Sequence, residues 1–246
     1  MIELDRRETE AGVIRIFERR ADGARLYCLD ASVQSMVDAH GVSLFGYVHA
    51  AKLLLAHAND VLILGGAGGS LATMMARCGK RVTVVEIEPA AEELARRHFG
   101  LARTVTWINA DASTYLAQTT DKFDAIVVDA CDADGLVSAF AGAEAVGAAM
   151  TALKPHGSLV LNLVTDDGAP PWGLALAQDL AALGLAVTLY RPDDGWEGNE
   201  LLHVHSAPAA AGIAIGDLSG RPAEVRTYLS SLSAHSPSAG VSARNA

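Results

Sequence analysis

The feature that most constrains the fold is a short apolar run that ends in a glycine-rich loop. Val61–Leu64 is continuously apolar and leads into Gly65-Gly66-Ala67-Gly68-Gly69, after which Leu71–Cys78 has a helical pattern. Glycines let backbone N–H groups approach a ligand closely, and the N-terminus of the next helix favours an anion. The segment therefore predicts a strand, a ligand-binding turn and a helix of an α/β protein.

The same rhythm of strand, loop and helix continues along the chain. A second helix is predicted over Ala90–Phe99, with Pro89 in its first turn, where a missing N–H costs nothing. The further predicted strands are Arg81–Val85, Thr104–Ile108, Ala125–Val128, Leu159–Leu163, Ala186–Tyr190 and Leu201–His205. Continuous apolar strands that alternate with helices predict a doubly wound, mainly parallel, Rossmann-like sheet covered on both faces.

Two flanking regions differ from this pattern. Residues 1–44 predict a small β region with strands at Val13–Arg19, Arg25–Leu29 and Ser32–Met36. Residues 45–231 form the larger predicted domain, which opens with a helix over Phe45–His57 and closes with a short helix at Pro222–Leu232. Residues 232–246 are rich in Ser and Ala, and we expect them to be a disordered tail.

Composition narrows the class of partner. The chain has 246 residues and a formal net charge of −10, which repels nucleic acid and anionic membranes and favours cationic guests such as amines. No apolar run is long enough to span a bilayer, and the first 20 residues lack a signal-peptide core. Three cysteines without a CxxC pair argue against disulfides and zinc. We therefore expect a cytoplasmic protein with no metal, no membrane and no nucleic acid partner.

Acids at the ends of the predicted strands supply candidate binding residues. Glu86 ends the strand after the glycine loop, where an acid can accept hydrogen bonds from a ribose diol. Asp111 follows the next strand and could accept from an adenine amino group, or simply cap the helix that begins at Ala112. A dinucleotide fingerprint would need a third glycine where Leu71 stands. The pattern favours an adenosine-containing ligand.

Asp129 and Asp132 follow the strand Ala125–Val128 directly. The carboxyl ends of parallel strands meet at one crevice, so these acids should face the same region as the glycine loop. Carboxylates there would hold a cationic substrate, and one could accept a proton from an attacking amine. A merely solvated acidic loop is the alternative, and no His or Glu stands at a spacing that fits a metal site.

Several segments together resemble the spermidine synthase family of polyamine aminopropyltransferases. They are Leu29–Gln34, Tyr47, Val61–Ser70, Val84–Pro89, Ala110–Ala112 and Ile126–Asp132. The resemblance implies a class I S-adenosylmethionine transferase fold, decarboxylated S-adenosylmethionine as the donor, a small amine as the acceptor, and a homodimer. It implies that Asp129 deprotonates the attacking nitrogen and that Asp132 and Tyr47 bind the acceptor. The implied donor-binding residues are Gln34, Gly65, Gly66, Gly68, Gly69, Glu86 and Asp111.

Three positions depart from the family pattern. Gly68 stands where the family has an aspartate that holds the aminopropyl ammonium, His49 replaces a glutamate, and Ala133 replaces a proline. The change at Gly68 keeps a second function open, methyl transfer from ordinary S-adenosylmethionine to a small molecule. A third alternative is a non-catalytic nucleoside-binding domain.

Overall fold

The computed structural model describes residues 1–132, 135–136, 140, 142–165, 172–192, 198–205, 213 and 216–237, without the side chains of 131, 132, 135, 136, 165 and 172. Within these residues the central sheet has eight strands in the order β14-β12-β13-β11-β8-β5-β6-β7. The strands are β5 (Asp60–Leu64), β6 (Arg81–Glu86), β7 (Thr106–Asn109), β8 (Phe123–Val128), β11 (Leu153–Thr165), β12 (Ala186–Pro192), β13 (Gly198–His205) and β14 (Leu232–His235).

The middle of this sheet is parallel, as the sequence predicts. Strands β11, β8, β5, β6 and β7 pair in parallel, and β13, β12 and β14 add antiparallel pairs on one side. After β8, the two-residue strands β9 (Cys131–Asp132) and β10 (Gly135–Leu136) pair with each other. The doubly wound α/β architecture is therefore confirmed.

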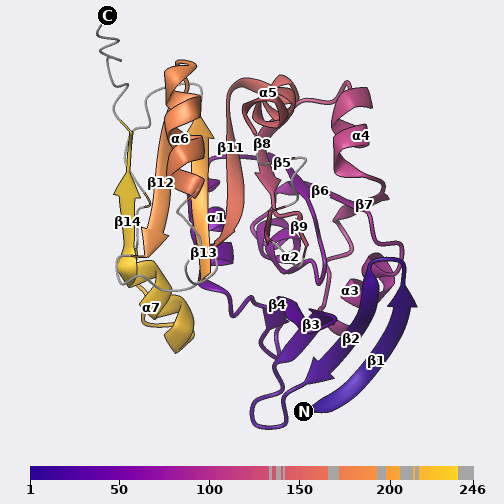
Figure 1. Cartoon of the computed structure of the whole chain (residues 1–246). Coiled ribbons are helices and arrows are strands. Elements are labelled where there is room, and N and C mark those ends of the chain that lie inside the picture. The colour runs from indigo at the N-terminus through magenta and orange to yellow at the C-terminus, as the bar shows by residue number, and fades with distance from the viewer. Residues whose placement is uncertain are drawn as a thin grey trace, which may run out of the picture.

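Helices cover both faces of the sheet (Figure 1). Along β5, Val61 and Ile63 join the core beneath α1 (Gly46–Leu54), α2 (Ser70–Ala76) and α7 (Ala223–Ser231). Leu62 and Leu64 face the other way, into the core beneath α4 (Ala112–Gln118), α5 (Ala143–Thr151) and α6 (Trp172–Ala182). Because alternate residues of a strand point to opposite faces, a continuously apolar strand fits a sheet buried on both sides.

A separate antiparallel sheet precedes this domain. Its strands, in order, are β1 (Ile2–Thr9), β2 (Gly12–Glu18), β3 (Arg25–Leu29) and β4 (Ser32–Val37). Ile14 and Ile16 of this sheet pack against Leu94 and Phe99 of the α3 (Ala91–His98) segment, so the small sheet lies beside the carboxyl ends of the central strands. The sequence did not predict β1, because most of its residues are charged and exposed. Backbone pairing with β2 orders the strand, together with contacts of Asp5 and Arg7 with α3.

The prediction of a disordered tail is wrong for its first residues. Leu232–His235 is not disordered but forms β14, which pairs antiparallel with β12 at the sheet edge. Leu232 packs against the core, and backbone pairing with Leu189–Pro192 orders this segment although its sequence has few large apolar side chains. Residues 238–246 of the expected tail lie outside the described residues.

One further helix and the full length of one strand were not expected. Helix α5 (Ala143–Thr151) is rich in Ala and has a weak apolar pattern, and β11 extends well beyond the predicted Leu159–Leu163. No helix in the described part of the chain is both long and apolar enough to cross a bilayer.

Candidate functional site

A cavity of about 210 Å³ opens at the carboxyl ends of β5, β8 and β11. It is bounded by the start of β4, the start of α1, the glycine loop and three strand ends. Its polar lining includes the side chains of Ser32, Gln34, Ser35, Tyr47, Ser70, Asp129, Asn162 and Asn199, with Gly65, Gly66 and Gly69 of the loop. The structure thus brings together six of the predicted site residues, namely Gln34, Tyr47, Gly65, Gly66, Gly69 and Asp129.

The glycine loop is tied to Asp129 by close backbone packing. Gly65 has φ +92°, and a Cβ at this position would lie 2.5 Å from the carbonyl oxygen of Asp129. The Asp129 N–H in turn donates to the Leu64 carbonyl at 2.7 Å. Glycine is required at position 65 both by the positive φ and by this approach, which sets the loop directly beside the acid.

Glu86 holds the loop rather than lining the cavity. Its Oε2 accepts hydrogen bonds from the N–H groups of Gly66 at 2.7 Å and Ala67 at 3.1 Å. Its Oε1 accepts from the N–H of Glu88 at 2.9 Å. The carboxylate therefore fixes the loop's backbone, and any hydrogen bond to a ribose would add to or exchange with these contacts.

Gly68 lies behind a serine that the sequence analysis did not single out. The Gly68 N–H donates to Oγ of the buried Ser35 at 3.1 Å. A Cβ at position 68 would lie 2.9 Å from Ser35 Cβ and 3.0 Å from Phe99 Cδ1. The loop as folded has no room for the family's aspartate, and the Ser35 hydroxyl occupies that side of the site.

Asp129 is partly buried, and both of its carboxyl oxygens have partners. Its Oδ1 accepts from Asn162 Nδ2 at 2.7 Å, and the Tyr47 hydroxyl lies 3.4 Å from Oδ2. Desolvation raises the pKa of Asp129 to about 7, an effect that these two hydrogen bonds oppose and the nearby charge of Glu86 reinforces. A carboxyl group with such a pKa can take and release a proton near neutral pH.

Two asparagines complete this arrangement and were missed from the sequence. Asn162, which is 2% exposed, receives at its Oδ1 a hydrogen bond of 2.9 Å from Asn199 Nδ2. A polar residue inside the apolar run Leu159–Leu163 was the signal that could have identified Asn162. Asn199 stands near the start of β13, outside the predicted strand Leu201–His205, so no signal pointed to it.

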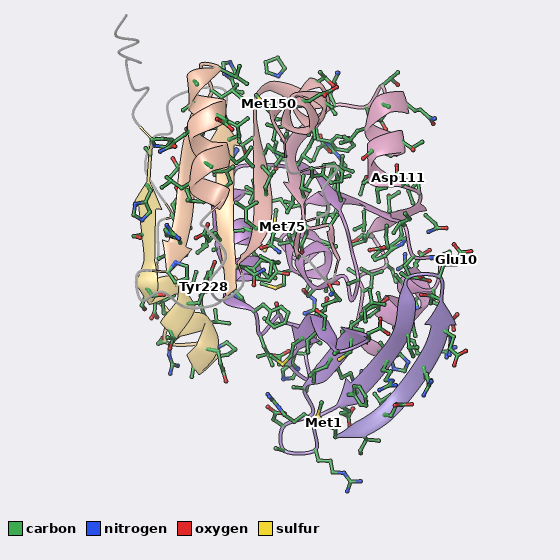
Figure 2. The ribbon with its side chains drawn as sticks, in the orientation of Figure 1. Met1, Glu10, Met75, Asp111, Met150 and Tyr228 are labelled. Atoms are coloured by element: carbon green, nitrogen blue, oxygen red, sulfur yellow. The ribbon has the colours of Figure 1, made fainter. Side chains whose placement is uncertain are left out.

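The remaining predicted residues lie elsewhere. Asp111 is exposed at the β7 edge of the molecule (Figure 2), and its Oδ1 accepts from the Thr114 N–H at 2.8 Å as the N-cap of α4. The capping alternative is thus what the structure shows, and Asp111 does not line the cavity. Asp132 belongs to β9, but its side chain lies outside the described part of the structure.

The described residues contain no group of three or more His, Cys, Asp or Glu side chains placed to hold a metal ion. What the cavity does combine is a glycine loop at the start of a helix, a row of neutral hydrogen-bonding side chains, and one acid with a raised pKa. This combination suits a polar ligand placed on the loop beside a group that exchanges a proton.

The sequence of this chain is similar to those of known proteins. Residues 47–165 match the spermine/spermidine synthase domain. The chain is 27% identical over 154 residues to polyamine aminopropyltransferase 1 of Streptomyces coelicolor, covering 58% of this chain and 29% of that protein. It is 28% identical over 173 residues to a polyamine aminopropyltransferase of a Ruegeria species, and this match covers 66% of this chain and 59% of that protein. It therefore spans less than two thirds of the length of these relatives.

The fold has counterparts among solved structures. A probable spermidine synthase from Corynebacterium glutamicum superposes with a TM-score of 0.71 at 20% identity, over 82% of this chain and 80% of that one. At this identity the match concerns the fold alone, and it extends on both sides of residues 47–165. The chain thus has the fold of a solved probable spermidine synthase, and its residues 47–165 are similar to the spermine/spermidine synthase domain, as the resemblance of its motifs predicted.

Proposed function

We propose that this protein transfers an aminopropyl group from decarboxylated S-adenosylmethionine to the nitrogen of a small amine such as putrescine. The observation that carries the proposal is Asp129, set against the glycine loop at the cavity wall, held by Tyr47 and Asn162, with a pKa of about 7. The similar proteins named polyamine aminopropyltransferases support the same chemistry.

In the proposed reaction, Asp129 first takes a proton from the ammonium form of the acceptor, which frees the nitrogen lone pair. The nitrogen then attacks the aminopropyl carbon bonded to sulfur, so a C–N bond forms as that C–S bond breaks. The electron pair leaves with sulfur as 5′-methylthioadenosine. Because the sulfonium is already a good leaving group, the protein contributes mainly orientation and the deprotonated nucleophile.

The donor would lie along the glycine loop, with Gly65, Gly66, Gly68 and Gly69 beside it and Gln34 facing it across the cavity. We propose that Glu86 holds the glycine loop through its hydrogen bonds with Gly66 and Ala67 and also accepts a hydrogen bond from the ribose. Asp111 remains a proposed adenine contact through its second carboxyl oxygen. Tyr47 and Asp132 are the proposed acceptor contacts, with Asp132 suited to a distal ammonium group.

Methyl transfer remains a second candidate because of one observation. Ser35 and Phe99 fill the space beside Gly68, so a neutral hydroxyl stands where the resemblance implies an aspartate for the donor's ammonium group. A neutral contact gives less preference for the decarboxylated donor over ordinary S-adenosylmethionine, which carries an additional carboxylate.

A product assay separates these candidates. The purified chain is incubated with putrescine and either form of the donor, and the nucleoside product is identified by mass spectrometry. We expect 5′-methylthioadenosine from the decarboxylated donor. S-adenosylhomocysteine from the ordinary donor would instead establish methyl transfer, and tight donor binding without any product, with each of a series of amines, would leave a nucleoside-binding domain.

A further inference from the structure

The chain of polar contacts behind Asp129 continues to the C-terminal helix. Asn162 donates to the Asp129 carboxylate, and Asn199 Nδ2 donates to Asn162 Oδ1. The backbone carbonyl of Asn199 then accepts a hydrogen bond of 2.6 Å from the hydroxyl of Tyr228, on α7. These contacts link residues that are far apart in sequence, from β8 through β11 and β13 to α7.

The carboxylate determines how the two side-chain amides are turned. A carboxylate can only accept, so Asn162 must turn its NH₂ toward Asp129 and its carbonyl oxygen toward Asn199. Asn199 satisfies that oxygen with its own NH₂. If Asn199 were absent, the Asn162 amide could rotate and present its carbonyl oxygen to the acid, which would repel the ionised carboxylate.

Tyr228 also contacts the residue that precedes Tyr47, the second partner of Asp129. A Cβ at Gly46 would lie 2.3 Å from Cγ of Tyr228, so the tyrosine ring packs directly on the first turn of α1, next to Tyr47. Tyr228 is 9% exposed and lies on α7, where Figure 2 shows it far from Asp111. One buried side chain thereby contacts the start of α1, beside Tyr47, and the Asn199 carbonyl on β13.

We propose that Asn162, Asn199 and Tyr228 are positioning residues that hold the Asp129 carboxylate and couple its proton affinity to the docking of α7. The inference deepens the proposed function, because Asp129 is there the group that accepts the amine proton. Among the described side chains, the titratable groups that act on Asp129 are Tyr47 and Glu86. None of the three proposed residues is itself charged, so they act through hydrogen-bond geometry.

The test measures the titration of Asp129 with and without turnover. Asn162→Ala, Asn199→Ala and Tyr228→Phe are compared with the parent by infrared difference spectroscopy of the protonated-carboxyl C=O stretch, identified with Asp129→Asn. Loss of a hydrogen bond to the ionised form should raise the Asp129 pKa, by about one unit for Asn162→Ala. Asn199→Ala and Tyr228→Phe should shift the pKa in the same direction by smaller amounts.

Tyr190→Phe is the matched control, because Tyr190 is another buried tyrosine of the same core, on β12, and it removes a hydroxyl outside this chain of contacts. In the pH–rate profile, kcat at pH 7 should fall about fivefold for Asn162→Ala and recover at higher pH, while donor affinity stays unchanged.

Two results would overturn the proposal: an unshifted carboxyl titration in Asn162→Ala, or a Tyr228→Phe titration identical to that of Tyr190→Phe. The infrared measurement needs no turnover, so it decides the role of the three residues even if the proposed transfer activity fails. Conversely, an active enzyme with unshifted titrations would retain the proposed function and refute this inference.

Discussion

Strand β8 carries an aspartate near each end, and the two experience opposite environments. Asp124, at the start of the strand, accepts hydrogen bonds at 2.9 Å from the N–H groups of Asn59 and Asp60 and pairs with Lys154 at 3.0 Å. The Asp60 N–H and Lys154 lower the pKa of Asp124 to about 2. Asp129, just past the other end, has a pKa raised to about 7 by desolvation.

The difference follows from the partners that the acids have at the two ends of the parallel strands. At the amino ends of the parallel strands, ion pairs of Asp60 and Asp124 with Arg81 and Lys154 stabilise the ionised acids. At the carboxyl ends, desolvation raises the pKa of Asp129, and its two hydrogen-bond donors, Asn162 and Tyr47, are neutral rather than cationic. The two aspartates at the ends of this strand thus differ in pKa because their partners and their solvation differ, although the residue type is the same.

The largest expected effect concerns turnover. Asp129→Asn keeps the shape of the side chain and removes the proton acceptor, so kcat should fall by about 10²- to 10⁴-fold, with donor affinity nearly unchanged. Asp124→Asn is the control at the other end of β8 and should retain parental turnover. Steady-state kinetics with saturating donor and amine checks both, and parental turnover by Asp129→Asn would remove Asp129 from the mechanism.

The second prediction concerns the stability cost of Asp129. Its folded-state pKa lies above the unfolded value of about 4, so the folded state binds the proton more tightly and stability falls as pH rises from about 4 to 7. Asp129→Asn removes this cost and should stabilise the fold by about 1–3 kcal/mol at pH 8, with little gain at pH 4. Urea unfolding at the two pH values measures the difference, and equal gains at both would contradict the assignment.

The third prediction concerns Asp124, whose contribution to stability depends on pH in the opposite direction. The pKa of Asp124 is lowered in the folded state, so its contribution is present above pH 4 and is lost as pH falls from about 4 to 2. Asp124→Ala removes two hydrogen bonds to backbone N–H groups and should cost about 1–2 kcal/mol at neutral pH. The same unfolding measurements test this, and a variant as stable as the parent would show that the contacts at this end are not stabilising.

The smallest expected effect belongs to Asp111, which distinguishes capping from ligand binding. Asp111→Ala should destabilise the protein by about 1 kcal/mol through loss of the α4 cap, whereas Asp111→Ser keeps a capping oxygen and should be nearly neutral. Calorimetric titration with 5′-methylthioadenosine then tests the adenine contact. Parental affinity in Asp111→Ser would leave Asp111 as a cap alone.

The sequence predicts the elements whose signal is local. The sequence alone indicates the apolar runs of β5, β6 and β8, the glycine turn and the acids that follow each strand. The sequence does not indicate strands β1 and β14, because these segments become strands by pairing with β2 and β12 and have little apolar content. The hydrophobic pattern of a segment indicates which of its side chains are buried, and an edge strand buries few side chains.

For the site, the sequence determined which residue types follow the strand ends, since chain connectivity alone brings the carboxyl ends of parallel strands to one edge. Tertiary structure decided what each acid does there. Glu86 holds the loop, Asp111 caps a helix, and Asp129 contacts Asn162 from a strand more than thirty residues away. The proton affinity of a carboxyl group depends on its solvation and its hydrogen-bond donors, and for Asp129 those donors come from distant segments that only the folded chain brings together.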